Sequence, residues 1–214
     1  MIRGVLFDMD GVLVDSEKYI CEAAILMFKE IGITAKPDDF LPYVGAGENR
    51  YIGGVAEKYG VKEDIARLKE RTYQIYEAIT KGKLKSLPGV FSFISKCKKR
   101  GLKIAVATSA DKIKMDINLK EIGLQEETFD ATVNGLEVER KKPFPDIFIT
   151  ASHKLGLQPT ECLVVEDAIN GINAAKSAGA KCLGITTGFS KEQLSRADWI
   201  SESLADAPEA AITW

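Results

Sequence analysis

Two aspartates directly follow an apolar run near the start of the chain. Val5-Leu6-Phe7 reads as a buried strand, and Asp8 and Asp10 stand where that strand ends. Two unpaired acids at a buried strand end are costly, so a compensating cation is expected beside them. Magnesium prefers oxygen ligands and often combines one or two carboxylates with water and a substrate phosphate. The segment therefore indicates phosphate chemistry at a metal site.

Further polar groups follow other candidate strands. Thr108 and Ser109 end one strand, Glu166 and Asp167 end another, and Lys142 stands shortly before a helix. In an open parallel sheet, ligands bind beyond the carboxyl ends of the strands, so all these groups should face one cleft. A hydroxyl donor and an ammonium group suit the oxygens of a phosphate. We therefore expect Thr108 and Lys142 to bind the phosphoryl group.

The two leading aspartates suit different roles in phosphoryl transfer. Asp8 as a nucleophile makes a covalent aspartyl-phosphate plausible. Asp10, two residues further along an extended chain, projects to the same face and suits a general acid and then a general base. Asp8, Asp167 and the backbone carbonyl of Asp10 make a suitable oxygen shell for Mg²⁺.

The elements that must position these residues alternate between strand and helix. The strand candidates are apolar without alternation, which fits strands that are covered on both faces. They are Gly4–Phe7, Lys103–Thr108, Ala131–Val133, Cys162–Val165 and Cys182–Thr186. The helix candidates are Val90–Arg100, Lys112–Ile122, Asp146–Leu155 and Ala168–Ala178, the last of them stopped by Gly179. This alternation predicts an α/β fold with a doubly wound parallel sheet.

Residues 16–83 break the alternation and show no strand pattern. Ser16 is a plausible N-cap for a first helix that Gly32 stops, a second helix should follow Gly47, and a third should span Asp64–Thr80. We therefore predict a small all-helical domain at 16–83, inserted after the first strand of an α/β core formed by 1–15 and 84–214. Asp15 is expected to guide the chain into the insert.

Composition and charge exclude several classes of partner. The 214 residues contain 29 Lys and Arg against 31 Asp and Glu, a net charge of −2, which gives no global attraction to nucleic acid or to an anionic membrane. No run approaches the roughly 18 apolar residues of a membrane helix. Four cysteines without a Cys-x-x-Cys pair and one histidine, His153, argue against a zinc site and for reduced thiols.

Location and assembly are also expectations. Met1 leads straight into the first strand without a charged leader or long apolar stretch, so a cytoplasmic protein is expected. No pattern specifies an oligomeric state, and we expect a monomer whose partner is a small phosphorylated metabolite.

Four short motifs, taken in order, resemble those of the haloacid dehalogenase-like (HAD) superfamily of phosphotransferases. They are Asp8-Met9-Asp10-Gly11-Val12-Leu13-Val14-Asp15, Thr108 in VATSAD, Lys142 in KKPFPDIF, and Glu166-Asp167 in VVEDAINGI. Order and spacing agree over the whole chain, and the helical insert falls where this superfamily carries its cap domain. The resemblance implies a Rossmann-like HAD core that uses Mg²⁺.

The resemblance also implies roles for single residues. Asp8 is the nucleophile and Asp10 the acid and base, while Thr108 and Lys142 hold the transferring phosphoryl group. Asp8, Asp10 through its carbonyl, and Asp167 bind Mg²⁺, with Glu166 supporting or joining the shell. The expected phosphate- and substrate-binding residues are Met9, Thr108, Ser109, Lys142, Gly45, Gly47, Glu48 and Arg50.

Within the superfamily, the chain is similar to β-phosphoglucomutase-like phosphatases with a helical cap. The mutases carry a histidine early in the first cap helix and an arginine in a cap loop, where this chain has Ile20 and Glu48. Arg50 stands two positions further on, about 200° around a helix. Hydrolysis of a small phosphorylated metabolite is therefore favoured, with a hexose phosphomutase as the alternative. A phospho-receiver module is a third hypothesis, which the cap insert and the four motifs oppose.

Overall fold

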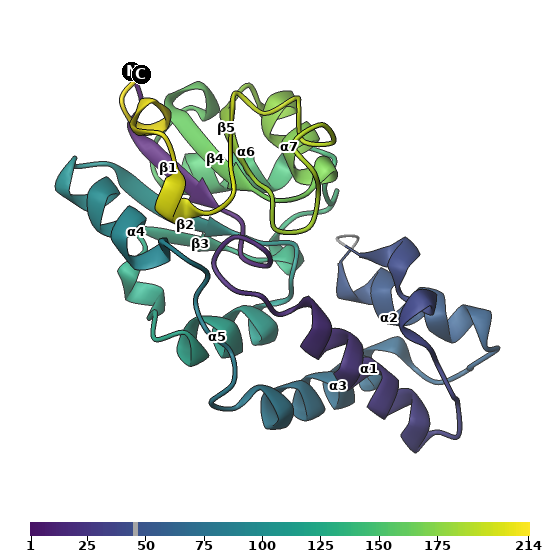
Figure 1. Cartoon of the computed structure of the whole chain (residues 1–214). Helices are drawn as coiled ribbons and strands as arrows, with labels where there is room; N and C mark the ends of the chain where they lie inside the picture. The colour runs from purple at the N-terminus through teal and green to yellow at the C-terminus, as the bar shows by residue number, and fades with distance from the viewer. Residues whose placement is uncertain (45–46) are drawn as a thin grey trace.

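The computed structural model describes residues 1–44 and 47–214, and a parallel sheet lies at its centre (Figure 1). The sheet has six strands in the spatial order β3-β2-β1-β4-β5-β6, and all neighbouring pairs run parallel. The strands are β1 (Gly4–Phe7), β2 (Lys103–Ala107), β3 (Ala131–Val133), β4 (Cys162–Glu166), β5 (Lys181–Ile185) and β6 (Trp199–Ser201). Because β1 lies between β2 and β4, the carboxyl ends of these three strands are adjacent.

Helices cover both faces of the sheet. Val5 and Phe7 of β1 pack into one apolar cluster with residues of α4 and α5, whereas Leu6 packs into a second cluster with α6 and α7. These helices are α4 (Val90–Lys99), α5 (Lys112–Glu121), α6 (Asp146–Lys154) and α7 (Ile169–Ala178). Burial on both faces explains why the strands are apolar without alternation, and it confirms the predicted doubly wound fold.

Between β1 and α4, the described residues form helices and no strand. The helices are α1 (Glu17–Glu30), α2 (Glu48–Lys58) and α3 (Ile65–Thr80). Both α1 and α2 pack against α3, and the apolar side chains of Met27, Phe28 and Tyr76 join the larger core cluster. Figure 1 shows this group at the end of the molecule away from the two termini, with α5 beside α3. The three predicted helices are confirmed, and the domain boundaries at 15/16 and 83/84 stay a prediction.

Short 3₁₀ turns complete the chain and lie mostly in the connections. They are Pro37–Asp39, Leu41–Tyr43, Glu126–Thr128, Gly135–Glu137, Pro159–Glu161, Leu204–Asp206 and Glu209–Ile212. None of the described helices has both the length and the apolar character needed to cross a bilayer.

The two segments that join the sheet to the helical insert run side by side. Val14 forms an isolated antiparallel bridge with Ser86, and the N–H of Leu87 donates to the carbonyl of Leu13 (3.0 Å). Ser16 stands at the N-cap of α1 as predicted, but its side chain makes no capping hydrogen bond. Its hydroxyl donates to Asp10 instead, so the predicted N-cap position is confirmed although the side chain does not cap the helix.

The ends of the predicted strands and helices agree with the structure or differ from it by one residue, and one strand was not predicted. β6 has three residues, of which Trp199 and Ile200 are half-buried, so it lacks the apolar run that marks the other strands. It lies at the edge of the sheet and pairs with β5 alone. Gly179 ends α7 with φ +84°, as the predicted helix stop requires.

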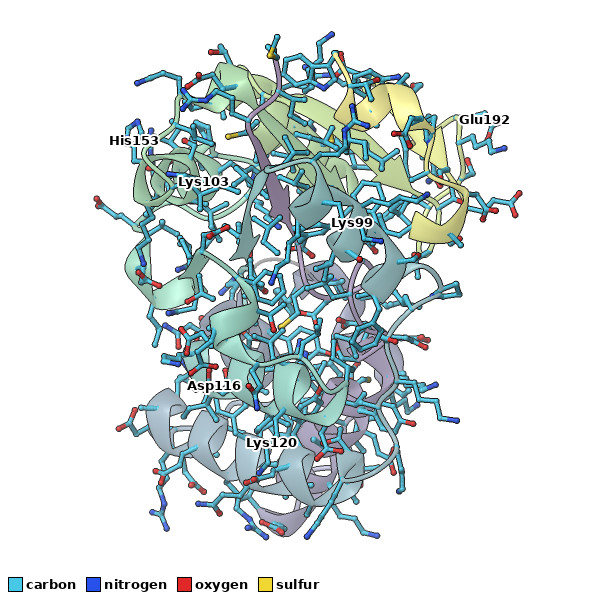
Figure 2. All side chains as sticks on the ribbon, turned by 90° about the vertical axis from the view of Figure 1, so that its left-hand side faces the viewer. Lys99, Lys103, Asp116, Lys120, His153 and Glu192 are labelled. Atoms are coloured by element: carbon cyan, nitrogen blue, oxygen red, sulfur yellow. The ribbon has the colours of Figure 1, made fainter. Side chains whose placement is uncertain are left out.

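The isolated histidine and the thiols have the expected structural settings. His153 lies on the outer side of α6 and points away from the protein in Figure 2, consistent with its exposure. All four cysteines are free, and Cys97, Cys162 and Cys182 are buried.

Candidate active site

The site is built around Asp8, the residue that follows the central strand. The backbone N–H of Asp8 donates to the carbonyl of Val165 in β4 (2.9 Å), which fixes its position between two strands. The side chain is only 7% exposed, and its Oδ1 lies 2.5 Å from Nζ of Lys142. One buried carboxylate therefore faces an ammonium group that is brought from the loop before α6.

Three carboxylates converge at this point. One ligand oxygen from each of Asp8, Glu166 and Asp167 lies within 4.8 Å of the others. Burial raises the pKa of Asp8 to about 7 against the opposing effect of Lys142, and burial and the neighbouring acids raise the pKa of Asp167. Three acids around one ammonium leave an excess of buried negative charge. This donor set fits a divalent cation that prefers oxygen ligands, such as Mg²⁺.

Glu166 and Asp167 are held differently. Oε2 of Glu166 accepts hydrogen bonds from the backbone N–H groups of Asp167 and Ala168 (both 2.9 Å), and Oε1 accepts from Lys142 (2.5 Å). Burial works against the charged form of Lys142, but the carboxylates of Asp8 and Glu166 outweigh it and raise the lysine pKa. Glu166 therefore orients Lys142, and Asp167 stands beside it in the cluster of three acids.

Gly11 allows the chain to turn beside these acids. Its φ is +78°, and a Cβ at this position would lie 2.0 Å from Oδ2 of Asp167, so a side chain does not fit. The Thr187 hydroxyl also donates to the Gly11 carbonyl (2.7 Å). The chain is therefore in a turn rather than extended after Met9, which corrects the alternation argument for Asp10. Asp8 and Asp10 nevertheless line the same cavity.

The side chain of Asp10 is held by three donors from two elements. Oδ1 accepts from the hydroxyl of Ser16 and from Nδ2 of Asn118 (3.2 Å), and Oδ2 accepts from Nζ of Lys114 (3.0 Å). Lys114 and Asn118 are one helical turn apart on α5 and are almost fully buried. We call the three donors Ser16, Lys114 and Asn118 the Asp10 clamp. Tyr76 of α3 donates to Oδ1 of Asn118 (2.5 Å), which connects the Asp10 clamp to the insert.

Hydroxyl groups at the end of β2 face the same cavity. Oγ1 of Thr108 accepts from the backbone N–H of Ala110 (3.1 Å), and the Thr108 N–H donates to Val133 (3.0 Å). The Ser109 hydroxyl is buried and has no hydrogen-bond partner among the described residues. An oxygen-rich ligand would supply that partner, since buried polar groups are normally hydrogen-bonded.

The cavity of about 660 Å³ lies between the sheet and the helical insert. Residues outside the insert contribute Asp8, Asp10, Glu166 and Asp167, together with Thr108, Ser109, Lys142 and Lys114 of α5. From the insert, the lining includes Glu17, Ile20, Leu41, Tyr43, Val44, Gly47, Glu48 and Tyr51. The site is thus completed by residues from both parts of the chain.

Glu48 is an unusual part of this lining. Its side chain is 7% exposed, Oε1 lies 3.8 Å from Nζ of Lys114, and Oε2 has no hydrogen-bond partner among the described residues. Burial raises the pKa of Glu48 to about 7; Lys114 opposes this shift, whereas Asp111 and Asp10 add to it.

Replacing Glu48 with Gln should therefore change how stability depends on pH. Between the ordinary glutamate pKa of about 4.3 and the folded value of about 7, the folded protein holds more protons than the unfolded chain. The Glu48 contribution thus lowers the free energy of unfolding as pH rises through this window. We expect the free energy of unfolding of Glu48→Gln, relative to that of wild type, to be higher at pH 8 than at pH 5 by on the order of 2 kcal/mol. Urea unfolding at the two pH values measures this change. An equal difference at both pH values would contradict the buried carboxyl assignment.

The chain also matches a known protein family over most of its length. A family model described as haloacid dehalogenase-like hydrolase matches residues 5–185. The chain belongs to the haloacid dehalogenase-like hydrolases. The predicted superfamily is therefore confirmed, and the chain is a phosphoric monoester hydrolase or phosphomutase of this family.

Two relatives show the range of the family around this chain. Protein SUPPRESSOR OF QUENCHING 1, chloroplastic, of Arabidopsis thaliana is 44% identical over 193 residues, which are 89% of this chain but only 18% of the plant protein. The phosphorylated carbohydrates phosphatase of Thermotoga maritima is 31% identical over 178 residues, which are 83% of this chain and 82% of that protein. The second relative is thus similar over nearly its whole length.

Solved structures of this family have the same overall arrangement. CbbY from Rhodobacter sphaeroides, solved with phosphate, superposes on this chain with a TM-score of 0.87 at 25% identity. The match covers 100% of this chain and 100% of that chain. A mutant of the same protein was solved with xylulose-(1,5)bisphosphate. The fold predicted from the sequence is confirmed.

Not all predicted site residues of this HAD hydrolase reach the cavity. Gly47 and Glu48 line it, whereas Gly45 lies outside the described residues. Arg50 is not among the lining residues: its guanidinium pairs with Glu57 (3.0 Å) and lies over the Tyr43 ring. The structure therefore does not bring Arg50 to the site, because its position on α2 turns it outward.

Met9 is the other predicted residue that the cavity lining does not include. Its side chain is fully buried and its sulfur accepts from Nδ2 of Asn118 (3.6 Å), while its carbonyl accepts from the turn that follows. Sequence reasoning in turn missed Lys114 and Asn118. The available signal was the pair of polar residues one helical turn apart beside Met115, on the side of α5 that faces the core.

Proposed function

We propose that this HAD hydrolase is a Mg²⁺-dependent phosphatase that hydrolyses a small phosphorylated metabolite through an aspartyl-phosphate on Asp8. The observation that carries the proposal is the placement of the Asp8 carboxylate. It stands at the end of the central strand, in contact with Lys142 and within one cluster with Glu166 and Asp167. The presence of Asp10 in the same cavity adds a proton carrier.

In the first half of the reaction, a carboxylate oxygen of Asp8 attacks the phosphorus atom. The new P–O bond forms as the bond from phosphorus to the leaving oxygen breaks, and Asp10 in its protonated form gives that oxygen a proton. Lys142 reduces the repulsion between the anionic nucleophile and the anionic phosphoryl group. Thr108 and the unpartnered Ser109 hydroxyl bind phosphoryl oxygens.

In the second half, water replaces the alcohol. Asp10, now a carboxylate, accepts a proton from the water as the water oxygen attacks phosphorus. The P–O bond to Asp8 breaks, the Asp8 carboxylate is restored, and inorganic phosphate leaves. Asp10 then carries the proton that the next substrate requires, so the cycle closes without another proton carrier.

The residues that would hold Mg²⁺ are Asp8, the backbone carbonyl of Asp10, and Asp167, with Glu166 supporting them. When bound, the cation supplies charge neutralisation for the acids and the phosphoryl oxygens. The convergence of three acids with one ammonium supports this assignment.

The helical insert, residues 16–83, is proposed to act as a cap over the core formed by 1–15 and 84–214. The paired linkers at Val14 and Ser86 provide a compact connection between the two parts. A cap excludes bulk water and contacts the leaving group, while the core holds the phosphoryl group. The insert residues that line the cavity support this division.

A phosphatase is favoured over a phosphomutase by the leaving-group side of the cavity. A mutase must hold a substrate with a second phosphate, and among the described lining residues there is no arginine or histidine. Glu48 lines the cavity with a carboxyl group, whereas a second phosphate would need a positively charged side chain. Arg50 pairs with Glu57 and is not among the lining residues. The similarity to a phosphorylated carbohydrates phosphatase supports the same choice.

Phosphate release from a panel of small phosphate monoesters tests the proposal. The panel includes p-nitrophenyl phosphate, hexose phosphates and polyol phosphates, each with Mg²⁺ and with EDTA. Release that requires Mg²⁺ supports the phosphatase, and no release from any monoester would refute it. Conversion of β-glucose 1-phosphate to an isomer without net phosphate release, dependent on a bisphosphate activator, would instead establish the mutase.

A further inference from the structure

The leaving-group side of the cavity carries a buried carboxylate that the proposed mechanism does not use. Glu48 opens the first turn of α2, lines the cavity and is more than nine-tenths buried. Its Oε2 has no hydrogen-bond partner among the described residues. A buried acceptor without a partner is costly, so a donor on the ligand would stabilise the complex.

Among the described residues that line the cavity, no free positive charge is left on this side to attract an anion. Seven acidic residues and two lysines line the cavity, namely Asp8, Asp10, Asp15, Glu17, Glu48, Glu166 and Asp167 against Lys114 and Lys142. Lys142 is occupied by the nucleophile and Glu166. Lys114 pairs with Asp10 (3.0 Å) and lies 3.8 Å from Glu48.

Two further lysines, Lys69 and Lys141, lie outside the cavity lining and have other partners. Lys69 pairs with Asp111 (2.5 Å) and donates to Asn49 (2.7 Å). The ammonium group of Lys141 donates to the carbonyls of Gly135 and Val138. Both ammonium groups are therefore already paired with groups of the protein.

We propose that the substrate of this enzyme is a monophosphate with an uncharged, hydroxyl-bearing leaving group, and that Glu48 accepts a hydrogen bond from one of its hydroxyls and excludes a second phosphate. This inference rests on the proposed phosphatase function. In either protonation state, Glu48 offers an acceptor oxygen and no positive charge.

The shared contacts of Lys114 place Glu48 near the reacting end of the substrate. Asp10 and Glu48 both contact the same ammonium, so the proton carrier and the unpartnered acceptor lie on one side of the cavity. A leaving oxygen that meets Asp10 brings its neighbouring carbons and hydroxyls toward Glu48. The apolar side chains of Ile20 and Leu41 also line the cavity and suit the carbon faces of a sugar or polyol.

A mutant of the structural neighbour CbbY was solved with a bisphosphate. A second phosphate placed against Glu48 would meet a carboxyl group in a buried setting, and like charges juxtaposed across an interface are strongly unfavourable. Substrate choice should therefore differ although the folds superpose.

The experiment compares matched substrate pairs with the full chain and Mg²⁺. The pairs are fructose 6-phosphate with fructose 1,6-bisphosphate, and glucose 6-phosphate with glucose 1,6-bisphosphate. We expect kcat/KM to favour the monophosphate by at least about tenfold in each pair that is turned over. Hexyl phosphate, which has no hydroxyls, should be a poorer substrate than the hexose monophosphates by about tenfold or more.

Charge reversal at Glu48 should move this preference. Glu48→Lys is expected to raise kcat/KM for the bisphosphates relative to the monophosphates by at least about tenfold. Glu57→Lys makes the same charge change on the same helix at an exposed residue outside the cavity lining, and it should leave the ratio unchanged. If Glu48→Lys fails to fold, Glu48→Gln should shift the ratio in the same direction by a smaller factor.

The outcomes distinguish this inference from the proposed function. If p-nitrophenyl phosphate and all the other esters are left intact, the phosphatase assignment itself is refuted. If p-nitrophenyl phosphate is hydrolysed but bisphosphates equal or exceed their monophosphates, the assignment stands and the inference is overturned. A ratio that moves equally in Glu48→Lys and Glu57→Lys would also overturn it, because the effect would then come from net charge.

Discussion

Asp8→Asn should lower the rate of phosphate release by on the order of 10⁴-fold, because the amide oxygen cannot form the aspartyl-phosphate. The change is nearly isosteric, so the turn at Gly11 and the contact with Val165 need not move. Steady-state release from p-nitrophenyl phosphate measures the effect. An acid-quenched sample of wild type, taken during turnover, should carry a phosphoryl group that hydroxylamine removes, and the variant should carry none.

A matched control is available on α5. Asp116→Asn makes the same chemical change at an exposed residue that pairs with Lys112, and Figure 2 shows Asp116 on the surface of the helix. Its rate should stay within about twofold of wild type, as for most surface changes. Undiminished release by Asp8→Asn, or a phosphorylated variant, would show that another group is the nucleophile.

The fold was predictable because the strands of this sheet are buried on both faces. Runs such as Cys162–Val165 have no polar alternation, and together with the alternating helices they fit a parallel sheet covered on both faces. β6 escaped prediction because Trp199 and Ile200 are half-buried at the sheet edge, where one neighbour pairs the strand. A short edge strand is specified by its partner β5 rather than by its own sequence.

The site was predictable to the extent that chain order determines it. Asp8, Thr108 and Asp167 stand at strand ends, and the parallel sheet brings those ends together regardless of the side-chain details. The direction of a side chain on a helix depends on how the helix is rotated about its axis, and sequence patterns determine that rotation less well. Arg50 turned outward for this reason, and Glu48, two residues earlier, turned inward.

Helix α5 shows why the Asp10 clamp escaped sequence reasoning. Apolar residues normally mark the buried face of a helix, yet Ile113 is 53% exposed while Lys114 is only 3% exposed. Burial is possible because acids from other segments surround the ammonium. Burial works against the charged form of Lys114, but Asp10 and Glu48 outweigh it and raise the lysine pKa. Asp10 and Glu48 are distant from Lys114 in the sequence, so no local pattern predicts these contacts.

Lys114→Met should lower kcat for alkyl phosphates by about 100-fold, because Asp10 loses the donor to Oδ2 and no longer meets the leaving oxygen in a fixed direction. The leaving group of p-nitrophenyl phosphate needs little protonation, so its rate should fall by less than about fivefold. This ratio of alkyl to aryl rates does not depend on the fraction of folded enzyme. Lys114→Arg keeps the charge and should recover part of the alkyl rate.

Two comparisons separate positioning from a general structural role. Lys112→Met removes an exposed ammonium on the same helix and should leave both rates near wild type. In an Asp10→Asn background, Lys114→Met should cost little more for alkyl phosphates, because a residue that acts through Asp10 has nothing left to orient. Equal losses with alkyl and aryl substrates, or losses that multiply in the double variant, would show that Lys114 acts independently of the proton carrier. Coupled losses would instead make α5 the element that sets the direction of proton transfer.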